Sequence, residues 1–152
     1  EADLAALTRR TVNQLAQVLS PRMSGLELPE GVDALHLVAI APDAADALLW
    51  RLLATLGGGC AAGEMLEAKV ESEGPVAKLT CEIPAQLMSV EDIFAADARP
   101  LGGSINAGLF GAGFALRLAR AEARAAGGDL IIDDETLILS LPLASAGADE
   151  VA

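Results

Sequence analysis

Apolar residues recur along this chain with two spacings, one typical of helices and one typical of strands. Three segments carry apolar residues three or four positions apart, which predicts amphipathic helices. Others alternate between apolar and polar residues, as strands with one buried face do. The expected helices cover residues 3–19, 42–56 and 108–126. The expected strands cover residues 26–28, 35–40, 65–71, 76–83, 130–132 and 137–141.

Cap and turn residues agree with these boundaries. Asp3 is a suitable N-cap for the first expected helix, and Pro42 lies in the first turn of the second. Glycines follow the second and third helices at 57–59 and 127–128, where a helix commonly ends. The helix boundaries are therefore supported by chemistry other than hydrophobicity.

Residues 84–107 show no clear periodicity and contain two prolines and the pair Gly102-Gly103. We expect a long loop with one helical turn near 90–96. A loop of this length in a compact domain is usually functional or mobile, and we expect this one to be mobile.

The third expected helix has two distinct stripes. Its inner face is predicted to consist of large apolar side chains, and its outer face carries arginines. The inner residues are Phe110, Phe114, Leu118 and Ala121. The outer residues are Arg117, Arg120 and Arg124. The arginine stripe has two interpretations, a docking surface for an acidic partner and an ordinary solvated helix face.

The order helix, strand, helix, two strands, loop, helix, two strands predicts an α+β fold. Strands with one wet face imply a two-layer sandwich, in which a mixed and mostly antiparallel sheet carries the helices on one face. We expect a single domain at residues 1–143 and a flexible tail at 144–152.

Acidic residues outnumber basic ones by 22 to 10, and the net charge is −12. This charge argues against unassisted binding to nucleic acid or to an anionic membrane surface. A local helix N-terminus can still hold an anion. No apolar run reaches the length of about 18 residues that a membrane span needs, so we expect no membrane contact by this segment.

A few single residues need an interpretation. Cys60 and Cys81 are expected to be small buried hydrophobic residues in a reducing, cytoplasmic compartment. His36, in an apolar strand, is expected to be structural. Trp50 lies off the leucine stripe of its helix, where it is either a surface anchor for a partner or a cover for the sheet edge.

The segment from Gly108 to Leu130 resembles the second glycine box of bacterial sensor histidine kinases and the helix that follows it. In that family a G-x-G-x-G-L loop leads into an amphipathic helix that ends in Gly-Gly. Gly111 and Gly113 occupy the matching loop positions, whereas Ala115 replaces the third glycine.

The resemblance extends over nearly the whole chain in architecture. Residues 43–56 are similar to the helix that carries the N box, and residues 65–83 resemble the central hairpin. The loop at 84–107 lies where the family has its ATP lid. The resemblance therefore implies the fold of a histidine-kinase ATPase domain.

The family binds ATP with magnesium, and the resemblance implies that Gly108, Gly111 and Gly113 approach the phosphates. Glycine permits such an approach, and a helix N-terminus supplies backbone N–H groups. The alternative is a flexible loop entering a helix that packs tightly on the sheet.

The family's metal and adenine residues are replaced in this chain. The two N-box positions hold Arg51 and Thr55, which are poor substitutes for a base and a magnesium ligand. Arg51 is expected to be an exposed helix charge. The adenine-reading Asp falls at Ile83, and Glu82 is one residue off, which turns its side chain to the other face of a strand. These replacements predict that ATP and magnesium bind weakly or not at all.

Three functions remain open at this point. The first is the ATP-binding domain of a two-component sensor histidine kinase, which supports phosphoryl transfer from ATP to a histidine outside this chain. The second is a degenerate, non-catalytic module for docking or regulation in a phosphorelay, with response regulators or other kinase domains as partners. The third is an unrelated α+β binding domain.

Overall fold

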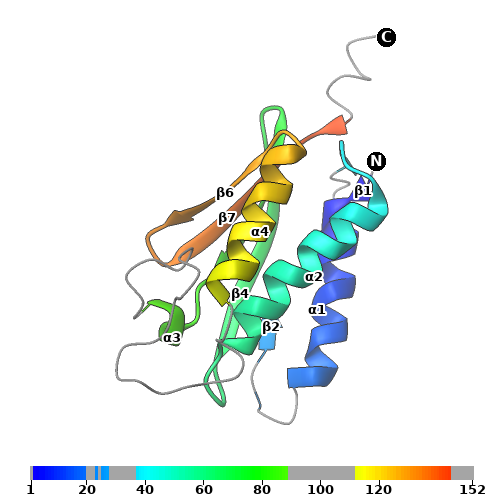
Figure 1. Cartoon of the computed structure of the whole chain (residues 1–152). Coiled ribbons are helices and arrows are strands. Elements are labelled where there is room, and N and C mark those ends of the chain that lie inside the picture. The colour runs from blue at the N-terminus through cyan, green and yellow to red at the C-terminus, as the bar shows by residue number, and fades with distance from the viewer. Residues whose placement is uncertain (1, 20–22, 24, 28–36, 89–111, 145–152) are drawn as a thin grey trace.

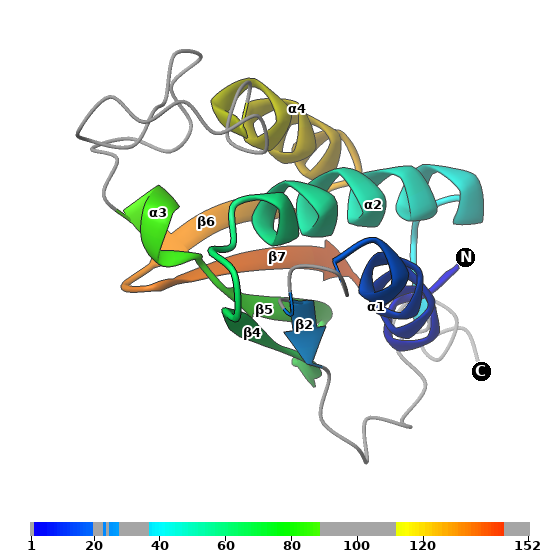
Figure 2. The same ribbon diagram turned by 90° about the horizontal axis from the view of Figure 1, so that it is seen from below.

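Helices cover one face of a mixed sheet that has five strands in the part of the chain that the structure describes (Figures 1 and 2). The structure is a computed structural model, and it describes residues 2–19, 23, 25–27, 37–88 and 112–144. This architecture confirms the predicted α+β sandwich with helices on one face of the sheet.

The helices begin and end close to the predicted positions. They are α1 (Leu4–Leu19), α2 (Pro42–Gly58), α3 (Ala85–Met88) and α4 (Ala112–Ala125). Asp3 caps α1, because its Oδ1 accepts a hydrogen bond from the backbone N–H of Ala5 at 3.1 Å. Pro42 is the first residue of α2, where its missing N–H costs nothing.

The main sheet has the strand order β2-β4-β5-β7-β6. Its strands are β2 (Gly25–Glu27), β4 (Met65–Glu73), β5 (Val76–Glu82), β6 (Asp129–Asp133) and β7 (Thr136–Pro142). The β2–β4 pair is parallel and the other pairs are antiparallel. Two short strands, β1 (Ala2–Asp3) and β3 (Leu37–Val38), pair with each other beside the N-terminus. The expected strand at 35–40 corresponds to β3, although His36 lies outside the described residues.

The core consists of aliphatic side chains between the sheet and the helices. In β4, Leu66, Ala68 and Val70 are buried while the residues between them are exposed. In α2 the buried stripe contains five leucines that follow one another along one face of the helix. These are Leu48, Leu49, Leu52, Leu53 and Leu56. The leucines belong to the same buried cluster as the inward side chains of the sheet, and α2 itself packs between α1 and α4 (Figure 2).

The predicted inner face of α4 is wrong. Phe114 and Leu118 are exposed, and so is Ala121, whereas Phe110 lies outside the described residues. A narrower stripe is buried in their place. It consists of Leu116, Ala119 and Ala123.

The turn that follows α4 brings the chain close to β7. A Cβ atom at Gly128 would lie 1.8 Å from the carbonyl oxygen of Ser140 in β7. The N–H of Gly128 donates to the carbonyl of Ala123 at 2.8 Å, and that of Gly127 donates to Arg124 at 3.0 Å. This is a Schellman cap, with Gly127 at a φ of +91°.

The expected loop at 84–107 begins with an element that periodicity did not indicate. The short helix α3 follows Pro84, and the N–H of Leu87 donates to the carbonyl of Pro84 at 2.9 Å. The helical turn expected near 90–96 lies outside the described residues. The role of 84–107 as a lid stays a prediction.

We predict that Gly128→Ala destabilises the domain by about 3 kcal/mol or more, because backbone atoms of β7 occupy the place of the new methyl group. Urea unfolding of both proteins measures this difference. Gly74→Ala is the control, because a Cβ atom there has open space around it and only the positive φ of 59° opposes the substitution. It is expected to cost only about 1–2 kcal/mol. Equal costs for both variants would contradict the close approach.

Candidate functional site

The N-terminal end of α4 is the described part of the predicted phosphate loop. Gly113 lies in the first turn of α4 and is buried. Gly108 and Gly111 lie outside the described residues. The first turn contains no acidic residue. An α-helix leaves N–H groups without partners at this end and carries a partial positive charge there, so the end of α4 is chemically suited to an anion.

The two N-box positions are both engaged in contacts within the protein. Arg51 in α2 forms an ion pair with Glu122 in α4, and both side chains are about two-thirds buried, with exposed fractions of 30% and 34%. Arg51 is therefore not the exposed helix charge that the sequence predicted. The hydroxyl of Thr55 donates to the carbonyl of Arg51 at 2.6 Å. The ion pair links two neighbouring helices, and the hydroxyl is bound within one helix.

These residues do not fit a magnesium ion. Within the described ranges, no group of three or more His, Cys, Asp or Glu side chains lies close enough together to hold a metal. Glu122 is the carboxylate that faces α2 from α4, and its partner is already a guanidinium. A cation at Arg51 repels a divalent ion, and a hydroxyl alone is a weak ligand for it.

The two adenine-box positions, Glu82 and Ile83, make structural contacts at the end of β5. The Oε1 atom of Glu82 accepts a hydrogen bond from the backbone N–H of Glu67 at 2.6 Å, one residue beyond the last β4–β5 register pair. Ile83 is buried, and its N–H donates to the carbonyl of Glu135 at 2.9 Å. Both residues therefore have structural contacts that explain their positions.

The three predicted docking arginines lie on one flank of α4. Arg117 and Arg124 are exposed, and Arg120 is half-buried. The Nε of Arg124 donates to Oδ1 of Asp129 at 2.9 Å, and this bond lowers the pKa of the Asp129 carboxyl. Trp50 is 43% exposed and is not among the buried residues of α2.

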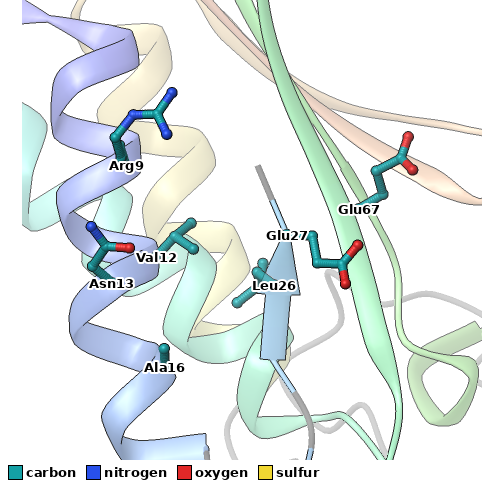
Figure 3. A pocket seen from close by; sticks show the side chains of 7 residues that line it. All are labelled: Arg9, Val12, Asn13, Ala16, Leu26, Glu27 and Glu67. Atoms are coloured by element: carbon teal, nitrogen blue, oxygen red, sulfur yellow. The ribbon is translucent and has the colours of Figure 1, made fainter. Parts of the chain in front are cut away.

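The sequence did not indicate an open groove on the other side of the molecule, between α1 and the β2 edge of the sheet (Figure 3). Its volume is about 520 Å³. Val12 and Leu26 form an apolar floor, and Glu27 and Glu67 lie on the sheet side. The remaining lining residues are Arg9, Asn13 and Ala16. No sequence pattern indicates this groove, because it depends on where α1 lies over the sheet edge.

Cys60 and Cys81 are buried, as predicted, and neither forms a disulfide. Burial, with smaller contributions from the nearby Cys60 and Glu82, raises the pKa of the Cys81 thiol from 9.0 to about 12. Within the described residues, no helix is long and apolar enough to cross a membrane.

Solved structures of histidine kinases share this fold, although no protein-family model matches the sequence and no curated protein matches it closely. The mycobacterial sensor histidine kinase MprB superposes with a TM-score of 0.61 at 14% identity, over 93% of this chain and 95% of that chain. The catalytic domain of histidine kinase ThkA, in a nucleotide-free form, superposes with a TM-score of 0.62 at 15% identity, over the same fractions. The chain therefore has the histidine-kinase catalytic-domain fold that the resemblance implied.

We predict that the Arg51–Glu122 ion pair contributes about 0.5–1 kcal/mol to stability, because both partners are only partly screened by water. A double-mutant cycle with Arg51→Gln and Glu122→Gln measures this coupling. The exposed pair Lys69–Glu71, whose side chains are 55% and 59% exposed, is the control and is expected to show a coupling near zero. Equal coupling energies in the two cycles would contradict the structural role assigned to Arg51.

We also predict that stability falls between pH 9 and pH 12 partly because of Cys81. The unfolded chain releases the thiol proton near 9.0, whereas the folded chain keeps it to about 12. The stabilisation is therefore complete below the lower pH and is lost as pH rises toward the higher one. Urea unfolding across this range is expected to give a flatter pH dependence for Cys81→Ala than for the parent chain, and an identical slope would contradict the raised pKa.

Proposed function

We propose that this chain, which has the fold of histidine-kinase catalytic domains, serves a two-component phosphorelay as a non-catalytic docking or regulatory module. The observation that carries this proposal is the state of the two N-box positions. Arg51 is held by Glu122, and the Thr55 hydroxyl is bound to the backbone of its own helix. Neither side chain is placed to act on a phosphoryl group or to bind a metal.

The adenine side supports the same conclusion. Ile83 offers an apolar side chain at the position where the family reads the adenine amino group, and that side chain is buried. Glu82 is engaged by the backbone of β4. The replacements thus affect metal and adenine recognition together, while the scaffold is retained.

A second candidate is the ATP-binding domain of a sensor histidine kinase that supports phosphoryl transfer to a histidine outside this chain. The N-terminal end of α4 favours it, because Gly113 lies in the first turn and that turn has no acidic residue. Both candidates place the chain in the cytoplasm, with response regulators or other kinase domains as partners.

Calorimetric titration with ATP and with a non-hydrolysable analogue, each with and without magnesium, separates the two candidates. We expect no magnesium-dependent binding at millimolar nucleotide, because the described residues supply no ligand set for the metal. Magnesium-dependent binding in the micromolar range would overturn the non-catalytic proposal and favour the second candidate.

If nucleotide binds weakly and without magnesium, the next question is whether its phosphates lie at the N-terminal end of α4. Phe114→Glu and Phe114→Gln form a matched pair for this case, because Phe114 is an exposed first-turn residue and only the glutamate adds charge. The carboxylate is expected to compete with phosphate for the helix N-terminus, and the amide is not.

A further inference from the structure

The outer side of α4 carries a continuous apolar stripe. Phe114 and Leu118 are 59% and 38% exposed, and Ala121 and Ala125 are exposed as well. The steps between these residues are four, three and four positions. The helix also buries a separate stripe through Leu116, so its outward stripe takes no part in the core.

Steps of four and three are the a and d spacing of a helix that packs against another helix. In this register Phe114 and Ala121 occupy d positions, and Leu118 and Ala125 occupy a positions. A helix at a protein surface normally has one apolar stripe and a polar opposite face. A second stripe with coiled-coil spacing therefore indicates a partner helix.

The charges beside the stripe indicate what that partner carries. Arg117 and Arg124 both fall at g positions, one heptad apart, and both are exposed. The bond from Arg124 Nε to Asp129 orients that side chain, which is still 59% exposed. On the opposite flank Glu122 is paired with Arg51. Charged residues at g positions form salt bridges with residues of opposite charge on a partner helix, so arginines there favour an acidic partner.

We propose that the outer stripe of α4 docks an amphipathic helix whose own apolar heptad stripe is flanked by Glu or Asp. The surface lies opposite the buried stripe of α4, and α2 is the helix beside α4 (Figure 2). This inference goes beyond the proposed function, because it names a surface and a partner chemistry and does not depend on nucleotide.

The net charge of the chain makes this local pattern informative. At −12 the protein as a whole repels an acidic partner. The uncovered face of the sheet reflects that charge, since Glu67 and Glu71 flank Lys69 on β4. Arginines beside the apolar stripe of α4 are therefore the feature that makes an acidic helix fit here.

Two synthetic three-heptad peptides test the proposal, both with Leu at a and d positions. One carries Glu at e and g positions, and the other carries Lys there. Repulsion between like charges keeps each peptide from pairing with itself at neutral pH. Calorimetry of the full chain is expected to show binding of the Glu peptide that weakens with added salt, and at least about tenfold weaker binding of the Lys peptide.

Variants of exposed residues locate the binding surface. Leu118→Gln is expected to weaken binding of the Glu peptide by about tenfold, because it removes a central apolar contact. Arg117→Glu with Arg124→Glu is expected to reverse the preference toward the Lys peptide. Val18→Gln is the matched control, because Val18 is also an exposed apolar helix residue but lies on α1.

Circular dichroism and thermal unfolding are expected to show that these variants remain folded. Equal binding of both peptides, or a loss with Val18→Gln as large as with Leu118→Gln, would overturn the proposal. So would sedimentation showing that the chain forms a dimer that Leu118→Gln dissociates, because the occupant of the stripe would then be a second copy.

Discussion

Burial of the leucine face of α2 is the constraint on which the rest of the structure depends. Five leucines on this helix are almost inaccessible to water, which requires a neighbour on three sides. The sheet covers one side, α1 a second and α4 a third (Figure 2). Removing such large side chains from water is the dominant favourable contribution to folding, so α1 and α4 are held at defined positions beside α2.

The same packing decides the chemistry at the candidate site. With its leucines inward, α2 turns Arg51 toward α4, where Glu122 meets it. Thr55 lies one turn further along and bonds to the backbone. A scaffold shared with histidine-kinase catalytic domains therefore carries an internal ion pair at one of the two positions that the resemblance matches to the N box. The proposed non-catalytic role rests on this contact.

Two further surfaces bear on the proposed docking role. The exposed stripe through Phe114 and Leu118 has helix-docking geometry, and arginines border it. The groove beside β2 has an apolar floor with carboxylates on its sheet side (Figure 3). A module that acts by docking needs such surfaces more than it needs a metal ligand.

The sequence alone determined the elements whose signals lie within a few neighbouring residues, such as alternation of apolar and polar positions, helix caps and turn glycines. Period-two alternation in β4 and β5, the N-cap at Asp3 and the glycines after α4 predicted strands, a helix start and a helix end that the structure confirms. The glycine pattern and the hairpins also indicated the kinase fold. Only the tertiary structure decided which face of α4 is buried, because that depends on how the helix is placed against α2, β6 and β7, where Leu116, Ala119 and Ala123 are covered. It also decided that Arg51 has a partner, because an ion pair between residues far apart in the sequence forms only once both helices have packed.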